Sequence, residues 1–561
     1  MRELPTGSSR SIEKRKRKTM TLYNSRGNAL MKSIRILDCT LRDGGFVNDW
    51  NFGHDCIINI LGRLDRAGID ILEVGYLRDG IEYNRDYTEF PNTDAVNDSI
   101  EKTSLKGMVV AIIDYGKCSI DSVKERNTSV IDGIRITFRK NEIDEALEFA
   151  SRVKDKGYKI FLQPVAITDY SAAEVVTFVN KANKLNPYAV CMVDTYGFMN
   201  RKDLIRYFYL FDGSLNAEIF LGYHSHNNFQ LSYANAIELI EQTSNRGLII
   251  DSSVFGMGKG AGNLNTELIT SYINSNIDYK YDISQILEII SIYIEKEKNT
   301  HEWGYNLRYF LAASTDTHHR YAQYLISKKT LSIKSINEIL MRIKKEKRTR
   351  YDEKYIEELY MEYQNVSIND IDTVEDLKEF CKGRKILLLA PGRSIVSEKN
   401  KIDDYIINEN PLIISINNII DGFKQDILFV SNSIRYSQIE DETEYYDIDK
   451  CGIIATSNIS TTALKPRWVV NYSSILAGDN PRVYDNSTLM ILKLLIRMGV
   501  KKVAIAGFDG FEKNNNYFKK GMALKKDLEE RTYEIRVVLN EMYKDIDILY
   551  VTTSKYIEGG V

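Results

Sequence analysis

Eight short apolar runs, each followed by a polar or helix-like segment, constrain the fold of the first half of the chain more than any other feature. Segments with helical periodicity between them include Cys56–Ala67, Ile143–Lys156 and Ser232–Thr243. Eight strand–helix repeats favour a TIM barrel over an open doubly wound sheet. The runs are Ile34–Leu37, Asp70–Tyr76, Met108–Ile113, Gly133–Thr137, Tyr158–Gln163, Ala189–Val193, Ile219–Tyr223 and Leu248–Phe255.

The rest of the chain divides into further segments, as expected for 561 residues. Residues 31–275 are assigned to the barrel and 276–365 to a helical extension that packs on it and forms a dimer surface. Residues 366–375 are a polar linker, and 376–561 form a Rossmann-like domain. The predicted class is therefore α/β: a TIM (β/α)8 barrel with a helical extension, plus a C-terminal Rossmann-like α/β domain. The helical segments are Ile286–Lys296, Asn306–Ser327, Ile333–Lys345 and Asp352–Tyr363.

The C-terminal domain is predicted from strand-like runs and one clear helix, Ser487–Met498. Such a pattern is typical of a mostly parallel sheet with a ligand site at its strand ends. The runs are Ile386–Ala390, Leu412–Ile416, Asp426–Val430, Gly452–Ala455, Trp468–Asn471 and Val503–Ala506.

Residues 1–30 are polar, contain the basic cluster Lys14–Lys18, and are interpreted as a disordered leader or one added for expression. A targeting peptide or a nucleic-acid arm is the alternative. The net charge of -3 gives no reason to expect nucleic acid as a partner. Six scattered cysteines without a CxxC pair predict reduced thiols and a cytoplasmic location. No apolar run approaches the roughly 18 residues of a membrane span.

Polar residues follow most of the barrel runs, at the ends where side chains converge on the catalytic rim. We expect Arg78, Gln163 and Asp194 to contact the substrate, with Arg78 as a carboxylate clamp. The residues in chain order are Asp43, Arg78, Asp114, Gln163, Asp194, His224 and His226.

Asp43, His224 and His226 supply one carboxylate and two imidazoles, which suit a divalent ion with open positions. Histidines at i and i+2 of a strand point the same way, so both reach one ion. Asn263 could add a neutral oxygen. The alternative is a pair of core or hydrogen-bonded histidines. The glycines of Gly256–Gly262 allow close backbone approach, which we favour over a phosphate loop.

Three motifs resemble those of the DRE-TIM metallolyases: Thr40–Gly44, His224–Asn227 and Gly256–Asn263. This family includes isopropylmalate synthases, hydroxymethylglutaryl-CoA lyases and 4-hydroxy-2-oxovalerate aldolases. The third motif, Gly-Met-Gly-Lys-Gly-Ala-Gly-Asn, is most similar to that of the aldolases. The resemblance covers about residues 34–327 and includes Gly304–Tyr305, which is similar to the start of an aldolase helix.

The resemblance implies that Asp43, His224 and His226 bind Mn²⁺ or Mg²⁺, which chelates a 2-oxo acid and polarises its ketone. It implies that Arg42 stabilises the oxyanion of a pyruvate-like enolate. Tyr305 matches a tyrosine near the reacting alcohol. The substrates would be a small 2-oxo acid and an aldehyde, in a homo-oligomeric enzyme.

One position departs from the aldolases, which carry a catalytic histidine three residues after the metal aspartate. Here that position is Phe46. Either the base is another residue or a metal-bound water, or the chemistry differs. The candidates for the base are Tyr76, Asp114 and Tyr305.

In the C-terminal domain, Pro391–Ser394 follows a buried strand and is a weak phosphate or nucleotide signal. Asn417 and Asn432 lie at later strand ends, where amides could hydrogen-bond a base or ribose. Gly392 and Ser394 complete the predicted nucleotide-binding set. The alternative is a structural α/β domain without activity.

The run Ser487–Phe511, which ends in Gly-Phe-Asp-Gly-Phe, resembles a helix–strand unit of bacterial sialyltransferase-like proteins. Their opening Gly-Pro-Ser is Pro-Gly-Arg-Ser here, and residues 385–561 contain no histidine to serve as their base. The resemblance therefore favours binding of a nucleotide or nucleotide-sugar over transfer.

The predicted function is a metal-dependent aldolase or carbon–carbon lyase acting on a pyruvate-derived 2-oxo acid, in surface polysaccharide or unusual-sugar biosynthesis. The role in surface polysaccharide or unusual-sugar biosynthesis rests on an analogy between folds alone. Two alternatives stay open: a Claisen-type acyl-CoA condensing enzyme, and a catalytically inactive barrel scaffold fused to a nucleotide-sugar-binding module.

Overall fold

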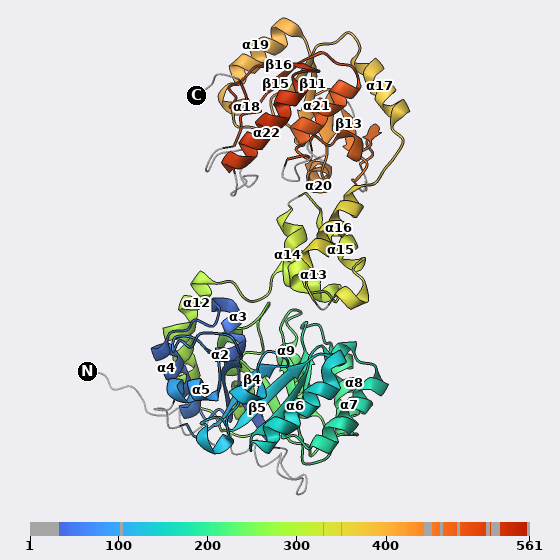
Figure 1. The fold of residues 1–561 in the computed structure, drawn as a ribbon. Coiled ribbons are helices and arrows are strands. Elements are labelled where there is room, and N and C mark those ends of the chain that lie inside the picture. The colour runs from blue at the N-terminus through green and yellow to red at the C-terminus, as the bar shows by residue number, and fades with distance from the viewer. Residues whose placement is uncertain are drawn as a thin grey trace, which may run out of the picture. The chain divides into compact units, whose positions relative to one another are not determined.

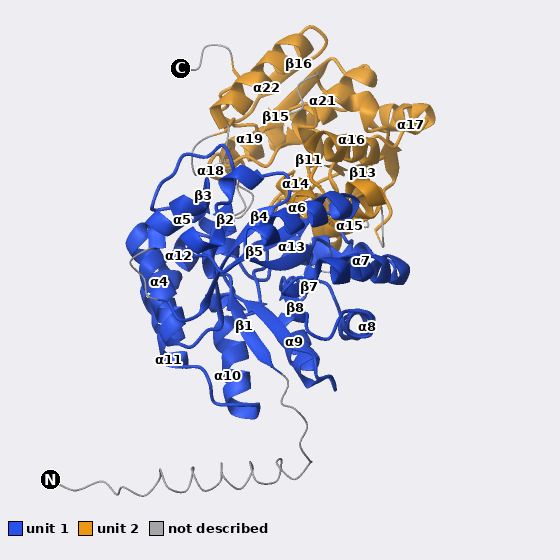
Figure 2. Cartoon of the chain, turned by 60° about the horizontal axis from the view of Figure 1, so that its bottom comes forward, with its two compact units in different colours: residues 1–316 blue, residues 317–561 orange. Residues whose placement is uncertain are grey.

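The computed structural model describes residues 33–100, 105–328, 330–348, 350–442, 451–459, 464–478, 483–511, 517 and 528–557. The predicted leader lies outside these residues. The chain divides into two compact units, unit 1 (Met1–Asp316) and unit 2 (Thr317–Val561) (Figure 2). Among the described residues, no helix is both long and apolar enough to cross a membrane.

Unit 1 contains a closed barrel of eight parallel strands, as predicted (Figure 1). The strands follow in the order β1-β9-β8-β7-β6-β5-β4-β2, and pairing of β1 with β2 closes the barrel. Strands such as β7 and β9 are buried at every position, because helices cover the outside and side chains fill the inside. The strands are β1 (Ile34–Asp38), β2 (Ile71–Leu77), β4 (Met108–Asp114), β5 (Gly133–Phe138), β6 (Lys159–Pro164), β7 (Ala189–Asp194), β8 (Phe220–Ser225) and β9 (Leu248–Ser252), with the short β3 (Glu89–Phe90) beside β2.

The helices around the barrel bury one apolar stripe each, and their ends follow local sequence signals. The start of α7 is fixed by a capping box between Ser171 and Glu174, and Asn186 ends it in a left-handed conformation. The outer helices are α4 (His54–Arg66), α5 (Thr93–Ile100), α6 (Ile143–Asp155), α7 (Ala172–Leu185), α8 (Arg201–Asp212), α9 (Ser232–Glu241) and α10 (Thr266–Asn276), while the single-turn α2 (Thr40–Asp43) and α3 (Gly45–Asn48) follow β1.

The helical region after the barrel does not form one extension. A continuous helical stretch comprises α11 (Ile283–Ile289), a π-helical turn (Ile290–Ile294) and α12 (Glu295–Thr300), and α13 (Leu307–Ser314) follows. The predicted segment Asn306–Ser327 is interrupted at Asp316, whose φ of 54° is left-handed. The two units divide at this residue, so helices after it belong to unit 2.

In the described part of unit 2, four helices precede a parallel sheet of seven strands in the order β14-β13-β12-β11-β10-β15-β16. The order reverses between β10 and β15, where such sheets bind ligands beyond their carboxyl ends. The strands are β10 (Ile386–Leu389), β11 (Leu412–Ile416), β12 (Ile427–Val430), β13 (Gly452–Thr456), β14 (Trp468–Val470), β15 (Lys502–Ala506) and β16 (Asp547–Tyr550). The helices are α14 (His319–Ser327), α15 (Ile333–Met341), α16 (Glu353–Gln364), α17 (Ile371–Cys381), α18 (Ser394–Ser397), α19 (Lys399–Glu409), α20 (Ser433–Glu442), α21 (Ser487–Arg497) and α22 (Leu528–Met542).

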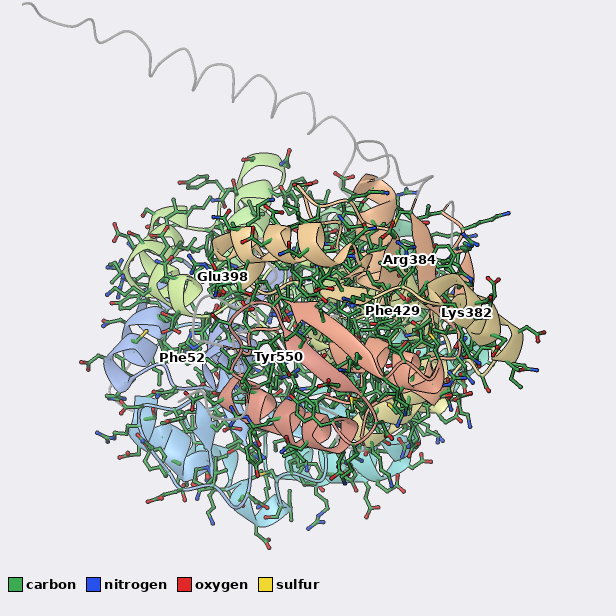
Figure 3. All side chains as sticks on the ribbon, turned by 90° about the horizontal axis from the view of Figure 1, so that it is seen from above. Phe52, Lys382, Arg384, Glu398, Phe429 and Tyr550 are labelled. Carbon is green, nitrogen blue, oxygen red and sulfur yellow. The ribbon has the colours of Figure 1, made fainter. Side chains whose placement is uncertain are left out.

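Six of these strands match the predicted runs, and β16 was not predicted because its alternate positions are exposed. Phe429 is fully buried in β12, whereas Lys382 and Arg384, between α17 and β10, are exposed (Figure 3). The central strands of the sheet are thus short and apolar, and charged residues such as Lys382 and Arg384 lie in the connection before β10.

The predicted linker 366–375 is only partly a connection, because its second half begins α17. Val374 and Leu377 of this helix join the core of the sheet. Asp370 forms an ion pair of 2.9 Å with Arg497 of α21, and the preceding Val366 carbonyl accepts a hydrogen bond from Ser457. Polar composition suggested a linker, but the Asp370 carboxylate attaches the segment to the domain that contains the sheet.

Candidate metal centre

Arg42 and Asp43 lie side by side in α2, directly after β1, as predicted. Asp43 is 1% exposed and forms an ion pair with Arg42. Burial would raise the pKa of Asp43, but Arg42 and the nearby imidazoles of His226 and His224 outweigh it and lower the pKa well below the usual value. Asp43 is therefore an anion at neutral pH, which is the state that binds a cation.

His224 and His226 point to the same side of the barrel. His224 lies within β8, which extends to Ser225, and His226 follows the strand. Their ring centroids are 5.2 Å apart, and both residues are buried. Burial lowers the pKa of His226 to about 3, so its imidazole is neutral and can donate a lone pair to a metal.

The loop Gly256–Asn263 approaches Asp43 closely. The Asn263 amide donates a hydrogen bond of 2.7 Å to Asp43 Oδ2, and the Lys259 backbone N–H lies 3.3 Å from the same oxygen. A Cβ at Gly258 would lie 2.7 Å from Asp43 Oδ2. Close backbone approach thus explains this glycine.

The donor set fits a divalent cation. Asp43, His224 and His226 each offer a ligand atom, and these atoms lie within 4.8 Å of one another. Among the described residues, His226 Nδ1 and Asn263 Oδ1 are buried without a hydrogen-bond partner. Leaving such an atom unpaired costs about 1–3 kcal/mol. A cation at this position would use lone pairs that the protein leaves unpaired.

Three charged residues that were not predicted lie behind the ligands. Glu73 Oε2 accepts a hydrogen bond of 2.7 Å from Arg42 Nε, and Asp251 Oδ2 lies 3.0 Å from His224 Nδ1. Arg135 pairs with both carboxylates. A signal was present, because each of the three is a charged residue inside an otherwise apolar strand run, and such residues are paired when buried.

Arg78 and Asp114 lie after neighbouring strands but each has another partner. Arg78 is half exposed and forms an ion pair of 3.0 Å with Glu89. Asp114 lies 3.4 Å from Arg139, and burial raises its pKa. Among the described residues, Asp114 does not belong to the cluster of Asp43, His224 and His226.

Gln163 and Asp194 take different sides of their strands. Phe161 belongs to the apolar cluster inside the barrel, so Gln163, two residues later, faces the same interior. The Asp194 carboxylate instead accepts hydrogen bonds from the backbone N–H groups of Phe198 (3.3 Å) and Met199 (3.1 Å). Burial raises the pKa of Asp194 to about 7. Asp194 therefore shapes the turn after β7.

Aromatic side chains lie beside Arg42. Its guanidinium carbon is 5.9 Å from the Tyr76 ring centroid, and burial raises the pKa of Tyr76. Phe46, 40% exposed, packs edge-on against Trp50 and Tyr76. The Lys259 ammonium lies 5.3 Å from the Phe46 ring centroid. A phenyl ring with a cation over it thus stands where the aldolases have histidine.

Tyr305 lies in the segment before α13 and is 59% exposed. Its ring meets Phe310 edge-on, with the centroids 6.5 Å apart. None of the contacts described for Tyr305 reaches Arg42 or Asp43.

The predicted nucleotide-binding residues of unit 2 all lie at the carboxyl ends of its strands, but each has a protein partner. The Ser394 backbone N–H donates to Asp509 Oδ2 (2.8 Å), so a carboxylate of the chain occupies the position that a phosphate would take. A Cβ at Gly392 would lie 2.2 Å from the Gly507 carbonyl oxygen. This turn is closed by contacts within the chain.

Asn417 and Asn432 are also paired. Asn417, with a left-handed φ of 58°, donates to Ser487 Oγ and accepts from the Ser431 backbone N–H (3.1 Å). Asn432 accepts from the Arg435 backbone N–H (2.9 Å) at the start of α20. These amides organise the strand ends.

The barrel and its ligands define a class: a TIM barrel with a carboxylate and two imidazoles at the carboxyl ends of its strands. Residues 33–292 match the model of the HMGL-like family. This part of the chain is an HMGL-like (DRE-TIM) domain, of a lyase-type family whose aldolases and decarboxylases are similar to it.

Two relatives illustrate the similarity. Oxaloacetate decarboxylase of Mycobacterium tuberculosis is 25% identical over 243 residues, which are 42% of this chain and 68% of that protein. 4-Hydroxy-2-oxovalerate aldolase of Pseudoalteromonas translucida is 24% identical over 261 residues, 46% of this chain and 75% of that protein. Among solved structures, HMG-CoA lyase from Brucella melitensis has a TM-score of 0.39 and 15% identity, covering 48% of this chain and 99% of that chain. The similarity of unit 2 to sialyltransferase-like proteins stays a prediction.

Proposed function

We propose that unit 1 is a carbon–carbon lyase that uses Mn²⁺ or Mg²⁺ and acts on a pyruvate-derived 2-oxo acid. The observation that carries the proposal is the convergence of Asp43, His224 and His226 within 4.8 Å, next to the buried guanidinium of Arg42. A divalent ion bound by the three ligands would polarise the ketone of the 2-oxo acid.

The chain's own groups supply the rest. Arg42 is held by Glu73 and Asp43, so its remaining N–H groups are fixed before the substrate arrives. When the bond next to the carbonyl breaks, negative charge develops on the ketone oxygen, and a preorganised donor there lowers the barrier. Burial of these groups strengthens the interaction because little water screens it.

Two reactions fit this arrangement, and Phe46 bears on the choice. Aldol cleavage of a 4-hydroxy-2-oxo acid requires a base for the hydroxyl proton, and a phenyl ring cannot accept one. Decarboxylation of a 2-oxo dicarboxylic acid needs no such base. The bond to the terminal carboxylate breaks, CO₂ leaves, and the electron pair of the broken bond forms the enolate. The oxaloacetate decarboxylase among the relatives makes this the second candidate.

The test is an assay for pyruvate with purified full-length protein and Mn²⁺, supplied with 4-hydroxy-2-oxovalerate or oxaloacetate. Asp43→Ala should abolish both Mn²⁺ binding and pyruvate formation. Asp70→Asn is a matched control, because Asp70 pairs with Lys280 next to the start of β2 and away from the ligands. Turnover in Asp43→Ala equal to that of the wild type would remove the proposal.

Binding of a nucleotide or nucleotide-sugar at the carboxyl ends of β10–β12 is proposed for unit 2. It is supported by the place of Gly392 and Ser394 after β10, which flanks the reversal, and of Asn417 and Asn432 after the neighbouring β11 and β12. Because Ser394 and Asn417 are paired within the chain, a nucleotide would have to displace those contacts. Combined with a lyase, it would suit unusual-sugar or surface polysaccharide synthesis, by analogy between folds. Titration of the full-length protein with CMP, UMP and their sugar conjugates tests it, and no binding to any of them would overturn it.

A further inference from the structure

The two sides of the candidate metal centre are connected through the inside of the barrel by residues that are not ligands. Glu73 lies on β2, Arg135 on β5 and Asp251 on β9, and all three are at most 2% exposed. Glu73 and Asp251 lie two residues after Ile71 and Ile249, which belong to an apolar cluster inside the barrel, and Arg135 is in register with Phe161 of that cluster. Three charged residues therefore lie inside the barrel next to its apolar cluster.

Arg135 is the centre of this layer. Its Nη1 is 2.8 Å from Glu73 Oε1, and its Nη2 pairs with Asp251 Oδ2. The same carboxylates then hold the site: Glu73 through Arg42 Nε and Asp251 through His224 Nδ1. The series Arg42–Glu73–Arg135–Asp251–His224 thus spans the barrel. Its Glu73–Arg135 link is an ion pair, since Glu73 Oε1 and Arg135 Nη1 have no hydrogen-bond partner among the described residues.

We propose that Arg135 is a positioning residue of the metal centre. By holding Glu73 and Asp251 in place at once, it sets the orientation of Arg42 on one side and of His224 on the other. The inference rests on the proposed function, since it concerns the same metal site. A planar guanidinium has N–H groups in fixed directions and can pair with two carboxylates, which a single ammonium does less well.

The hydrogen bond to Asp251 has a direct consequence for His224. In the tautomer with the proton on Nδ1, this N–H donates a hydrogen bond to Asp251, and Nε2 keeps its lone pair for a metal. Arg135 forms an ion pair with the same Asp251 oxygen and so fixes the carboxylate that contacts His224 Nδ1. Loss of Arg135 would leave Asp251 without its main counter-ion and free to shift with the imidazole.

The charge of Arg135 and its positioning role predict opposite effects of its removal on cation affinity. With neutral imidazoles, the carboxylates of Asp43, Glu73 and Asp251 and the guanidinium groups of Arg42 and Arg135 leave one net negative charge. A divalent cation with a monoanionic 2-oxo acid would cancel it. Removing Arg135 makes the interior more negative, so charge alone would tighten cation binding, whereas loss of positioning would weaken it.

The experiment measures Mn²⁺ affinity by calorimetry for the full-length wild type, Arg135→Lys and the charge-balanced double variant Glu73→Gln/Arg135→Met. We expect both variants to bind Mn²⁺ about 10- to 100-fold more weakly, the range seen when groups that orient metal ligands are lost. Absorption spectra with Co²⁺ in place of Mn²⁺ should change in both, because they report the ligand geometry.

Arg246→Lys is the matched control. Arg246 lies just before β9 and is also buried, at 8% exposure. It forms an ion pair of 2.7 Å with Asp212 and donates to the backbone carbonyls of Ile219 and Leu215. Arg246→Lys should lower the unfolding temperature and leave Mn²⁺ affinity unchanged. Wild-type affinity or tighter binding in Arg135→Lys or the double variant would overturn the inference alone. Absence of Mn²⁺ binding by the wild type would overturn the metal site itself, and the inference with it.

Discussion

The two sheets of this protein place polar side chains at the same kind of position but use them differently. At the carboxyl ends of the barrel strands, His226 Nδ1 and Asn263 Oδ1 are buried without a partner among the described residues. At the carboxyl ends of the sheet in unit 2, Ser394 is paired with Asp509 and Thr552, and Asn417 with Ser487.

The difference teaches that a polar residue at a strand end is not by itself a ligand site. Position brings such residues together in both sheets, as parallel topology requires. What separates them is whether the side chains satisfy one another, because an unpaired buried polar atom is costly and is retained where something else pairs with it. The barrel edge meets that criterion, whereas the predicted side chains of unit 2 are paired within the chain, so a nucleotide there would have to replace existing contacts.

The largest expected effect is that of Arg42→Lys in the barrel. The lysine keeps the charge but loses the fork that pairs with Glu73 and Asp43. Turnover should fall at least a hundredfold, about 3 kcal/mol of transition-state stabilisation, in the pyruvate assay. Near-normal kcat would mean that Arg42 is structural. Its polar groups would then only pair within the chain, as those at the strand ends of unit 2 do.

Paired glycine substitutions test the comparison directly. A Cβ at Gly258 would meet Asp43 Oδ2 at 2.7 Å, and one at Gly392 would meet the Gly507 carbonyl at 2.2 Å. Each overpacked alanine should cost about 1–3 kcal/mol. Gly258→Ala should weaken Mn²⁺ binding, whereas Gly392→Ala should lower the unfolding temperature with Mn²⁺ affinity retained. Equal loss of metal affinity in both would contradict the distinction.

The pH dependence of stability gives a third test. The pKa of His226 is about 3 in the folded protein, against about 6.5 when unfolded. The unfolded imidazole therefore takes up a proton first as the pH falls below 6.5, and the folded state loses about 2 kcal/mol by pH 5 from this residue. Metal-free wild type should lose that much more stability than His226→Gln between pH 7.5 and 5.

The comparison with His226→Gln is needed because Asp194 acts in the opposite direction. Its pKa is raised to about 7 in the folded protein. As the pH falls from 7, Asp194 is therefore protonated in the folded state before it is protonated in the unfolded state, and this stabilises the folded state. This contribution is common to both proteins and cancels in the difference. Identical pH profiles would show that His226 is not held neutral by burial.

The smallest effect is expected for Ser487→Ala in unit 2. Asn486, which caps α21, remains, but Asn417 Nδ2 and Ser431 Oγ lose their partner. The loss should be about 1 kcal/mol of unfolding free energy in denaturant titration. Unchanged stability together with loss of CMP binding would show that Ser487 serves the proposed nucleotide site and not the packing of this edge.

Much of the fold could be predicted from the sequence. All eight barrel strands and six strands of the second sheet coincide with apolar runs, because strands of a parallel sheet covered on both faces are apolar throughout. The break at Asp316 and the strand β16 were missed. A single left-handed residue and a strand exposed at alternate positions carry little hydrophobic signal.

The sequence by itself predicted the three candidate metal ligands of the barrel, Asp43, His224 and His226. His224 and His226 share a face because strand side chains alternate, and the Arg42–Asp43 pair follows directly from the first strand. Only the tertiary structure decided which charged residues hold them. Glu73, Arg135 and Asp251 come from three strands far apart in the sequence and meet because the barrel closes. Only the tertiary structure, likewise, placed Asp509 on the turn at Ser394. Local periodicity sets where a side chain points, and the closing of the sheet sets what it meets.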